Sequence, residues 1–157
     1  MSIGVSGHQN LPALARARAE KDIRALLARQ VGRVIGLSSL AAGADHLFAE
    51  LLVETGHRLH AVIPCRSYQE TFTGADLTTY LGLRAAAHTV TELDFPSPSE
   101  KAFDAAGKYV VEHCDLLVAV WDGRPAHGLG GTGDAVARAR KLHRDVLITW
   151  PEGVRRT

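Results

Sequence analysis

The sequence predicts a three-layer α/β protein of the Rossmann-like class, with helices on both faces of a doubly wound, mostly parallel sheet of about six strands. Two features of the chain predict this fold. Short runs of apolar and β-branched residues alternate with longer stretches of helical periodicity from one end of the chain to the other. One of these runs, residues 116–121, is apolar at every position, which is typical of a strand buried on both faces.

Predicted strands and helices follow each other in strict alternation. The runs predicted as strands are residues 3–6, 33–38, 59–63, 89–93, 116–121 and 146–150. The stretches predicted as helices are residues 11–29, 41–54, 76–87, 100–113 and 132–142, with Ser99 as the cap of the fourth. Parallel strands joined in this way leave a crevice beyond their carboxyl ends, so the residues after each strand are candidates for a binding site.

Composition limits the classes of function. The 157 residues are 46% apolar and 22% charged, as in an ordinary globular protein, and they suit a single domain over residues 1–157. Lys and Arg number 18 against 17 Asp and Glu, so the chain has no overall positive charge to recruit nucleic acid or an anionic membrane. We therefore expect any anion site to be local.

Nothing in the sequence predicts a membrane-spanning segment, a secreted protein or a metal site. No run reaches the ~20 apolar residues of a membrane span, and the first residues lack the pattern of a secretory signal. Cys65 and Cys114 lack the spacing of metal ligands and are expected to be small buried apolar residues. The sequence therefore predicts a cytoplasmic protein with no metal and no other cofactor.

Small polar residues follow the first two predicted strands and form the first candidate binding turns. These turns contain Ser6, Gly7, His8, Ser38, Ser39, Gly43 and Asp45. Gly7 permits a close backbone approach, and the serines precede a helix start whose amides could meet a phosphate. The alternatives are an ordinary strand-to-helix turn and, for Asp45, a favourable interaction with the helix dipole.

A glycine-rich loop follows the fifth predicted strand and opens the last helix. It contains Asp122, Gly123, Arg124, Gly130, Gly131, Thr132, Gly133 and Asp134. The amides and the positive dipole end of that helix make this loop the best candidate phosphate site in the chain, although an ordinary flexible loop would have a similar composition. Residues 64–75 follow the third strand and are a second irregular candidate loop.

At these same turns the sequence resembles the SLOG superfamily of Rossmann-like proteins, which includes DprA, the LOG phosphoribohydrolases, molybdenum-cofactor carrier proteins and the YpsA-like group. Residues 38–46, Ser-Ser-Leu-Ala-Ala-Gly-Ala-Asp-His, resemble its Ser-Gly-x-Ala-x-Gly-Ile/Ala-Asp element, and residues 128–134 resemble its glycine-rich second half. The resemblance implies that a nucleotide pocket is lined by Ser6, Gly7, Ser38, Gly43, Asp45, Gly130, Gly131 and Thr132.

One departure from the superfamily bears on catalysis. LOG-type phosphoribohydrolases resemble Pro-Gly-Gly-x-Gly-Thr-x-x-Glu, and aligning residues 130–133 with it places Ala137 at the catalytic glutamate. Asp45, Asp122 or Asp134 could replace that carboxylate, because glycosidic cleavage develops positive charge on the ribose. Arg124 or Arg66 could then bind phosphate, and His8 or His127 could protonate the leaving base.

The sequence thus favours a binder of a nucleotide or nucleotide-derived phosphorylated small molecule, acting as a sensor or carrier. A phosphoribohydrolase or N-glycosidase acting on nucleoside monophosphates is the alternative. Single-stranded nucleic-acid binding is least favoured, because it needs a basic groove with exposed aromatic residues and only 6% of the chain is aromatic. Apolar positions on more than one side of the helix within residues 40–52 predict a homo-oligomer.

Overall fold

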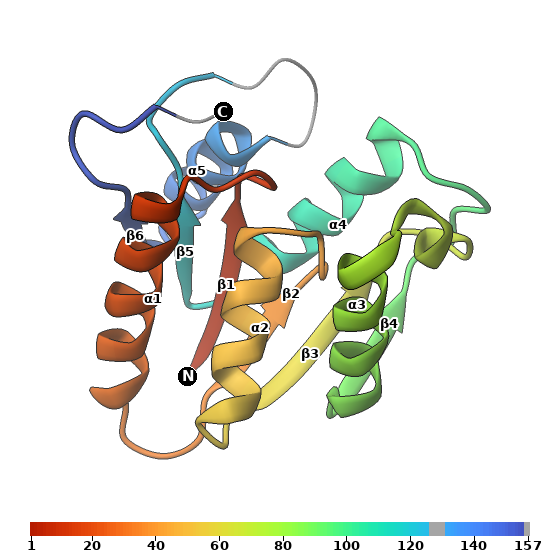
Figure 1. Ribbon diagram of the computed structural model, residues 1–157, viewed down its shortest axis with the longest axis horizontal. Helices are drawn as coiled ribbons and strands as arrows, with labels where there is room; N and C mark the ends of the chain where they lie inside the picture. The colour runs from red at the N-terminus through yellow and green to blue at the C-terminus, as the bar shows by residue number, and fades with distance from the viewer. Residues whose placement is uncertain (126–130, 156–157) are drawn as a thin grey trace.

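The computed structural model describes residues 1–125 and 131–155 of the chain and contains a six-stranded sheet in which every pairing is parallel (Figure 1). The strands are β1 (Ser2–Gly7), β2 (Ile35–Ser38), β3 (Arg58–Ile63), β4 (Thr89–Glu92), β5 (Leu116–Val120) and β6 (Asp145–Thr149). The helices are α1 (Ala13–Ala28), α2 (Ala44–Glu54), α3 (Gly74–Ala86), α4 (Glu100–Glu112) and α5 (Thr132–Lys141). The predicted order of elements and the α/β class are confirmed.

Two local features differ from the expectation. The helix predicted from residue 41 begins at Ala44, because Leu40 and Gly43 take positive φ angles of 57° and 81° and turn the chain before it can become helical. A 3-10 turn, η1 (Tyr68–Thr71), lies within the predicted irregular segment 64–75. The cap of α4 is as predicted, since the Ser99 side chain accepts a hydrogen bond of 3.0 Å from the Ala102 amide.

The strand order is β4-β3-β2-β1-β5-β6, so the chain changes direction across the sheet at β1 and β5. Helices α1, α2 and α3 cover one face, and α4 and α5 cover the other (Figure 1). Helices that leave β1 and β5 therefore pass to opposite faces. This divergence opens a crevice at the carboxyl ends of those two strands, where ligands bind in open α/β sheets.

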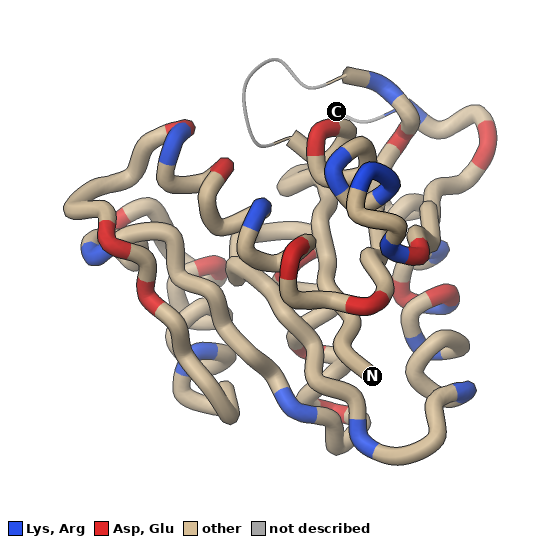
Figure 2. The backbone as a smooth tube through the Cα atoms, turned by 180° about the vertical axis from the view of Figure 1, so that it is seen from behind, with Lys and Arg blue, Asp and Glu red and all other residues tan. Residues whose placement is uncertain are grey.

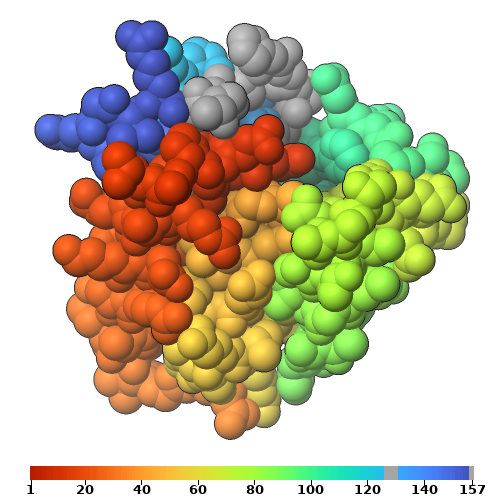
Figure 3. All heavy atoms as spheres, in the orientation of Figure 1, coloured from red at the N-terminus to blue at the C-terminus, as the bar shows by residue number. Residues whose placement is uncertain are grey.

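The core lies between the sheet and the two helix layers. Residues 117–120 of β5 are all fully buried, as the continuous apolar run predicted, because helices cover both faces of that strand. The space-filling view shows α1, α2 and α3 side by side on one continuous face, with α2 between the other two (Figure 3).

Helix α2 is buried on several sides by its own chain. Eight of its residues are buried, and it contacts α1, α3 and the first three strands. The apolar positions that predicted a homo-oligomer are therefore covered within one protomer. They require no second copy of the chain.

Candidate functional site

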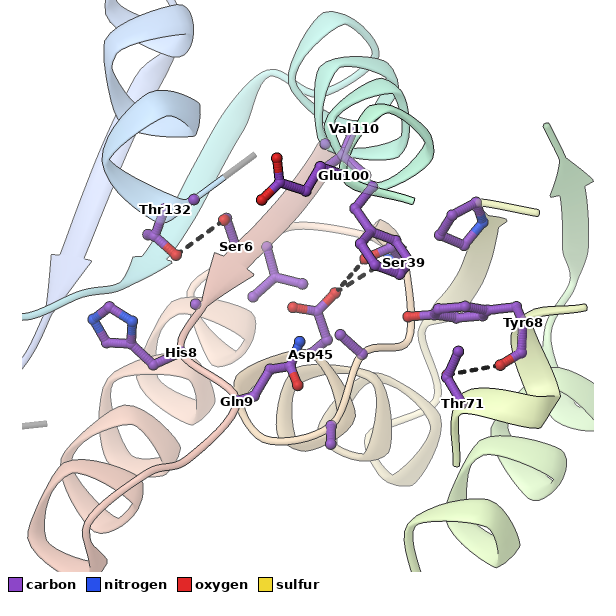
Figure 4. A pocket seen from close by; sticks show the side chains of 18 of the residues that line it. Ser6, His8, Gln9, Ser39, Asp45, Tyr68, Thr71, Glu100, Val110 and Thr132 are labelled. Atoms are coloured by element: carbon purple, nitrogen blue, oxygen red, sulfur yellow. Dashed lines mark hydrogen bonds between the residues drawn. The ribbon is translucent and has the colours of Figure 1, made fainter. Parts of the chain in front are cut away.

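A cavity of about 850 Å³ opens at the carboxyl ends of the strands, beside the change of direction between β1 and β5. The predicted site residues that line it are Ser6, Gly7, His8, Ser39, Asp45, Arg124, Gly131 and Thr132 (Figure 4). Its volume lies in the range of about 300–1,000 Å³ that is usual for sites of small molecules and cofactors. The residues come from six different elements or loops, so only the fold brings them together.

Gly7 allows three elements to meet at the floor of this cavity. A Cβ atom at this position would collide with the Cβ atom of Ala44 at the start of α2 and would lie 2.8 Å from the Cβ atom of Val120 at the end of β5. A backbone hydrogen bond also joins the ends of β1 and β5, since the His8 amide donates to the Val120 carbonyl at 3.2 Å. Glycine at residue 7 is thus needed for packing around the site.

Ser6 and Thr132 join β1 to the start of α5. The Ser6 hydroxyl donates to the Thr132 hydroxyl at 3.3 Å, although the two residues are 126 positions apart. Gly131 is the N-cap of α5 and supplies no side-chain hydrogen bond to the first amides of the helix. The two hydroxyl groups therefore lie at the N-terminus of α5, where the positive end of the helix dipole is suited to an anion.

His8 and Asp122 form a second polar pair at the ends of β1 and β5. The His8 Nε2 atom lies 3.3 Å from Asp122 Oδ1, and the His8 ring contacts Trp150 edge-on with 5.4 Å between ring centres. Asp122 Oδ1 also accepts from the Arg124 amide at 3.0 Å, and Gly123 has a φ of 85°. Asp122 thus shapes the turn after β5, while His8 lines the cavity.

Asp45 is the buried carboxylate of the site. Its side chain is 5% exposed, and its Oδ2 atom accepts hydrogen bonds from Ser38 Oγ at 3.1 Å, Ser39 Oγ at 3.0 Å and the Ser39 amide at 3.2 Å. Burial raises the pKa of Asp45 to about 6, although the serine hydrogen bonds oppose the shift. The residue therefore changes its charge near neutral pH at the wall of the cavity.

The remaining predicted site residues that the structure describes do not line the cavity. Ser38 is fully buried, and its hydroxyl donates a hydrogen bond to Asp45. Gly43 packs against the backbone carbonyls of the loop after β1, and Gly133 packs beside the Trp121 ring. Asp134 lies exposed in the first turn of α5. Gly130, together with His127, lies outside the described residues.

Sequence reasoning did not single out the opposite wall of the cavity. That wall carries Tyr68, Thr71, Phe72 and Thr73 from the predicted loop 64–75, and Glu100 and Phe103 from α4. Because residues 64–75 directly follow β3, their position in the sequence could have indicated that Tyr68, Thr71, Phe72 and Thr73 lie at the cavity. No local pattern indicates that the first turn of α4 reaches the cavity, because this depends on how α4 crosses the sheet.

No group of three or more His, Cys, Asp or Glu side chains among residues 1–125 and 131–155 is arranged to hold a metal ion. Within the same ranges, no helix is long and apolar enough to cross a membrane.

The fold and the cavity define a Rossmann-like α/β protein with a site at the β1–β5 boundary. No protein-family model matches the sequence, and no curated protein matches it. Solved structures do match. The chain is similar to DNA processing protein A (DprA) from Streptococcus pneumoniae, at 19% identity and a TM-score of 0.72, covering 94% of this chain and 49% of that one. It thus spans about half the length of that protein.

Two further structures have the same arrangement. One is the DNA processing protein A from Helicobacter pylori, described for its single-stranded DNA binding, at 15% identity and a TM-score of 0.68, covering 100% of this chain and 68% of that one. The other is the molybdenum cofactor carrier protein from Chlamydomonas reinhardtii, at 18% identity and a TM-score of 0.60, covering 94% and 74%. At these identities the likeness establishes the fold alone, so the predicted Rossmann-like α/β arrangement is confirmed.

Proposed function

We propose that the protein binds a nucleotide or a nucleotide-derived phosphorylated small molecule in this cavity, as a sensor or carrier. The observation that carries the proposal is the junction of β1 with α5. There, the Ser6 and Thr132 hydroxyls lie 3.3 Å apart at the N-terminus of α5, at the edge of a cavity of about 850 Å³. A phosphate placed there accepts hydrogen bonds from the amides and interacts favourably with the helix dipole.

The charges around the cavity favour a ligand with few negative groups. Arg124 is the only Lys or Arg among the described residues that line it, whereas Asp45, Asp76 and Glu100 contribute carboxylates. A triphosphate would bring several negative charges next to these carboxylates, and like charges at short range repel. A single phosphate attached to a neutral polar group fits this balance better.

Charge also bears on the single-stranded nucleic-acid alternative. Basic and acidic positions are interspersed along the chain, with a group of basic positions on α5 at Arg138, Arg140 and Lys141 (Figure 2). Cations in the last turn of a helix stabilise its negative dipole end, which is a sufficient role for this group. The balance of charge therefore favours the small-molecule proposal.

Cleavage of the ligand is the second candidate function, and Asp45 is the observation that favours it. A carboxylate whose pKa is raised to about 6 at a cavity wall can exchange a proton near neutral pH or stabilise a developing oxocarbenium ion. Glu100 supplies a second carboxylate to the same cavity, whereas Asp134 does not line it. An N-glycosidase acting on a nucleoside monophosphate would therefore depend on Asp45 and Glu100.

A thermal-shift panel tests the proposal and separates these candidates. The panel contains nucleoside mono-, di- and triphosphates, a molybdopterin-like ligand and a short single-stranded oligonucleotide. A ligand at 100 times its dissociation constant should stabilise the fold by about 2.7 kcal/mol. We expect the largest shift with a monophosphate. Chromatography of that sample for released base then distinguishes a binder from an N-glycosidase.

The variant Thr132→Val ties binding to the start of α5, because it removes the hydroxyl and keeps the shape of the side chain. Thr55→Val is the matched control, since Thr55 lies at the far end of α2 and its hydroxyl donates only to carbonyls of its own helix. We expect the Thr132 variant alone to bind the monophosphate more weakly. Equal affinities in the two variants would show that the phosphate does not bind at the start of α5.

A further inference from the structure

Tyr68 places its hydroxyl group at the wall of the cavity. Its side chain is 4% exposed and lines the cavity, and Figure 4 shows the hydroxyl pointing into it from η1. The hydrogen bonds of residues 1–125 and 131–155 give this hydroxyl no donor or acceptor. The hydroxyl is not among the enclosed polar atoms of the described residues that lack a partner, so it is open to the cavity and can bond to a group placed there.

Neighbouring rings fix the position of this hydroxyl. The Tyr68 ring packs edge-on against Phe72 and Tyr80, with 5.0 Å and 5.5 Å between ring centres. Tyr80 belongs to the same cluster, but its hydroxyl accepts a hydrogen bond from Arg84 at 3.1 Å and it does not line the cavity. Of these two buried tyrosines, Tyr68 alone has its hydroxyl directed to the cavity.

Asp45 supplies an acceptor across the cavity from Tyr68, from the first turn of α2. The hydrogen bonds from Ser38 and Ser39 all fall on its Oδ2 atom, and Figure 4 shows the other oxygen turned away from these serines. Burial, followed by the charge of Asp45, raises the pKa of Tyr68, so its hydroxyl stays protonated and can donate. The apolar rings of Phe72 and Phe103 complete this part of the lining.

We propose that Tyr68 and Asp45 recognise the base of the bound nucleotide. In this arrangement the Tyr68 hydroxyl donates to a ring nitrogen or carbonyl oxygen of a planar heterocycle, and the Asp45 carboxylate accepts from an N–H group on another edge of the same ring. The aromatic residues of the same wall contact the faces or edges of the ring. The inference rests on the proposed function, and it makes the ligand class a nucleotide with its base attached rather than a sugar phosphate.

Isothermal titration of AMP, GMP, CMP, UMP and ribose 5-phosphate tests this inference, because ribose 5-phosphate has the phosphate and the sugar but no base. Tyr68→Phe removes only the hydroxyl, and Tyr80→Phe is the matched control within the same cluster. We expect Tyr68→Phe to raise the dissociation constant of the tightest-binding nucleotide by about three- to tenfold, the usual effect of losing one neutral hydrogen bond. Its affinity for ribose 5-phosphate should not change, and Tyr80→Phe should change neither affinity.

The other outcomes overturn the inference in distinguishable ways. If the wild-type protein binds none of the five probes, the proposed function fails and the base-recognition role fails with it. If the nucleotides and ribose 5-phosphate bind equally well, the phosphate site stands and the base-recognition role is wrong. If Tyr68→Phe weakens ribose 5-phosphate as much as the nucleotide, the hydroxyl contacts the sugar or the phosphate instead.

Discussion

Replacing Gly43 by alanine tests how the loop after β1 is held against α2. Gly43 has a φ of 81° and a ψ of −121°, a conformation that side chains disfavour. A Cβ atom there would collide with the Gln9 carbonyl oxygen and would lie 2.6 Å from that of His8. Both contacts are with backbone atoms, which cannot rotate away as a flexible side chain would.

Gly56 provides the control for this substitution. It also has a φ of 81°, but nothing lies within 4 Å of the position that its Cβ atom would take. Gly56→Ala should therefore cost only the backbone strain, about 1–2 kcal/mol. Gly43→Ala should cost that amount and a further 1–3 kcal/mol or so for overpacking.

Urea unfolding, followed by circular dichroism, measures both costs as free energies of unfolding. For a chain of this size the additional overpacking cost corresponds to a difference of about 2–12 °C in Tm between the two alanine variants. Equal destabilisation by Gly43→Ala and Gly56→Ala would refute the reasoning, because it would mean that the loop after β1 moves away from α2 without cost.

Two further predictions concern Asp45 and the cap of α4. Burial raises the pKa of Asp45 from 3.8 to about 6, so between these pH values the folded protein keeps a proton that the unfolded chain releases. Wild-type stability should therefore fall by about 2 kcal/mol from pH 4 to 7 relative to Asp45→Asn. Thermal unfolding of both proteins across this range checks the sign, and a constant difference would contradict it. Ser99→Ala should lower the free energy of unfolding, measured by chemical denaturation, by about 1 kcal/mol, because the Ser99 side chain accepts a hydrogen bond from the Ala102 amide. Thr73→Ala should cost less, since Thr73 makes no such bond at the start of α3, and the reverse order would contradict the assignment of the cap.

The sequence by itself determined the order of the secondary-structure elements. Each predicted strand and helix depends on a pattern within a few residues, such as the unbroken apolar run of β5 or the serine that caps α4. Such patterns act locally, because hydrogen bonding and side-chain periodicity in one element depend mainly on its own residues. The turns after the strands could be predicted as site loops for the same reason, given the parallel sheet.

The tertiary structure alone decided which of these residues meet. Ser6 and Thr132 are 126 positions apart, and they come together because β5 pairs with β1 rather than with its neighbour in sequence, β4. Tyr68 is directed into the cavity by the rings around it, and the apolar sides of α2 are covered by α1 and α3. Pairing of strands and packing of helices depend on contacts between distant parts of the chain. No short window of sequence contains both partners of such a contact.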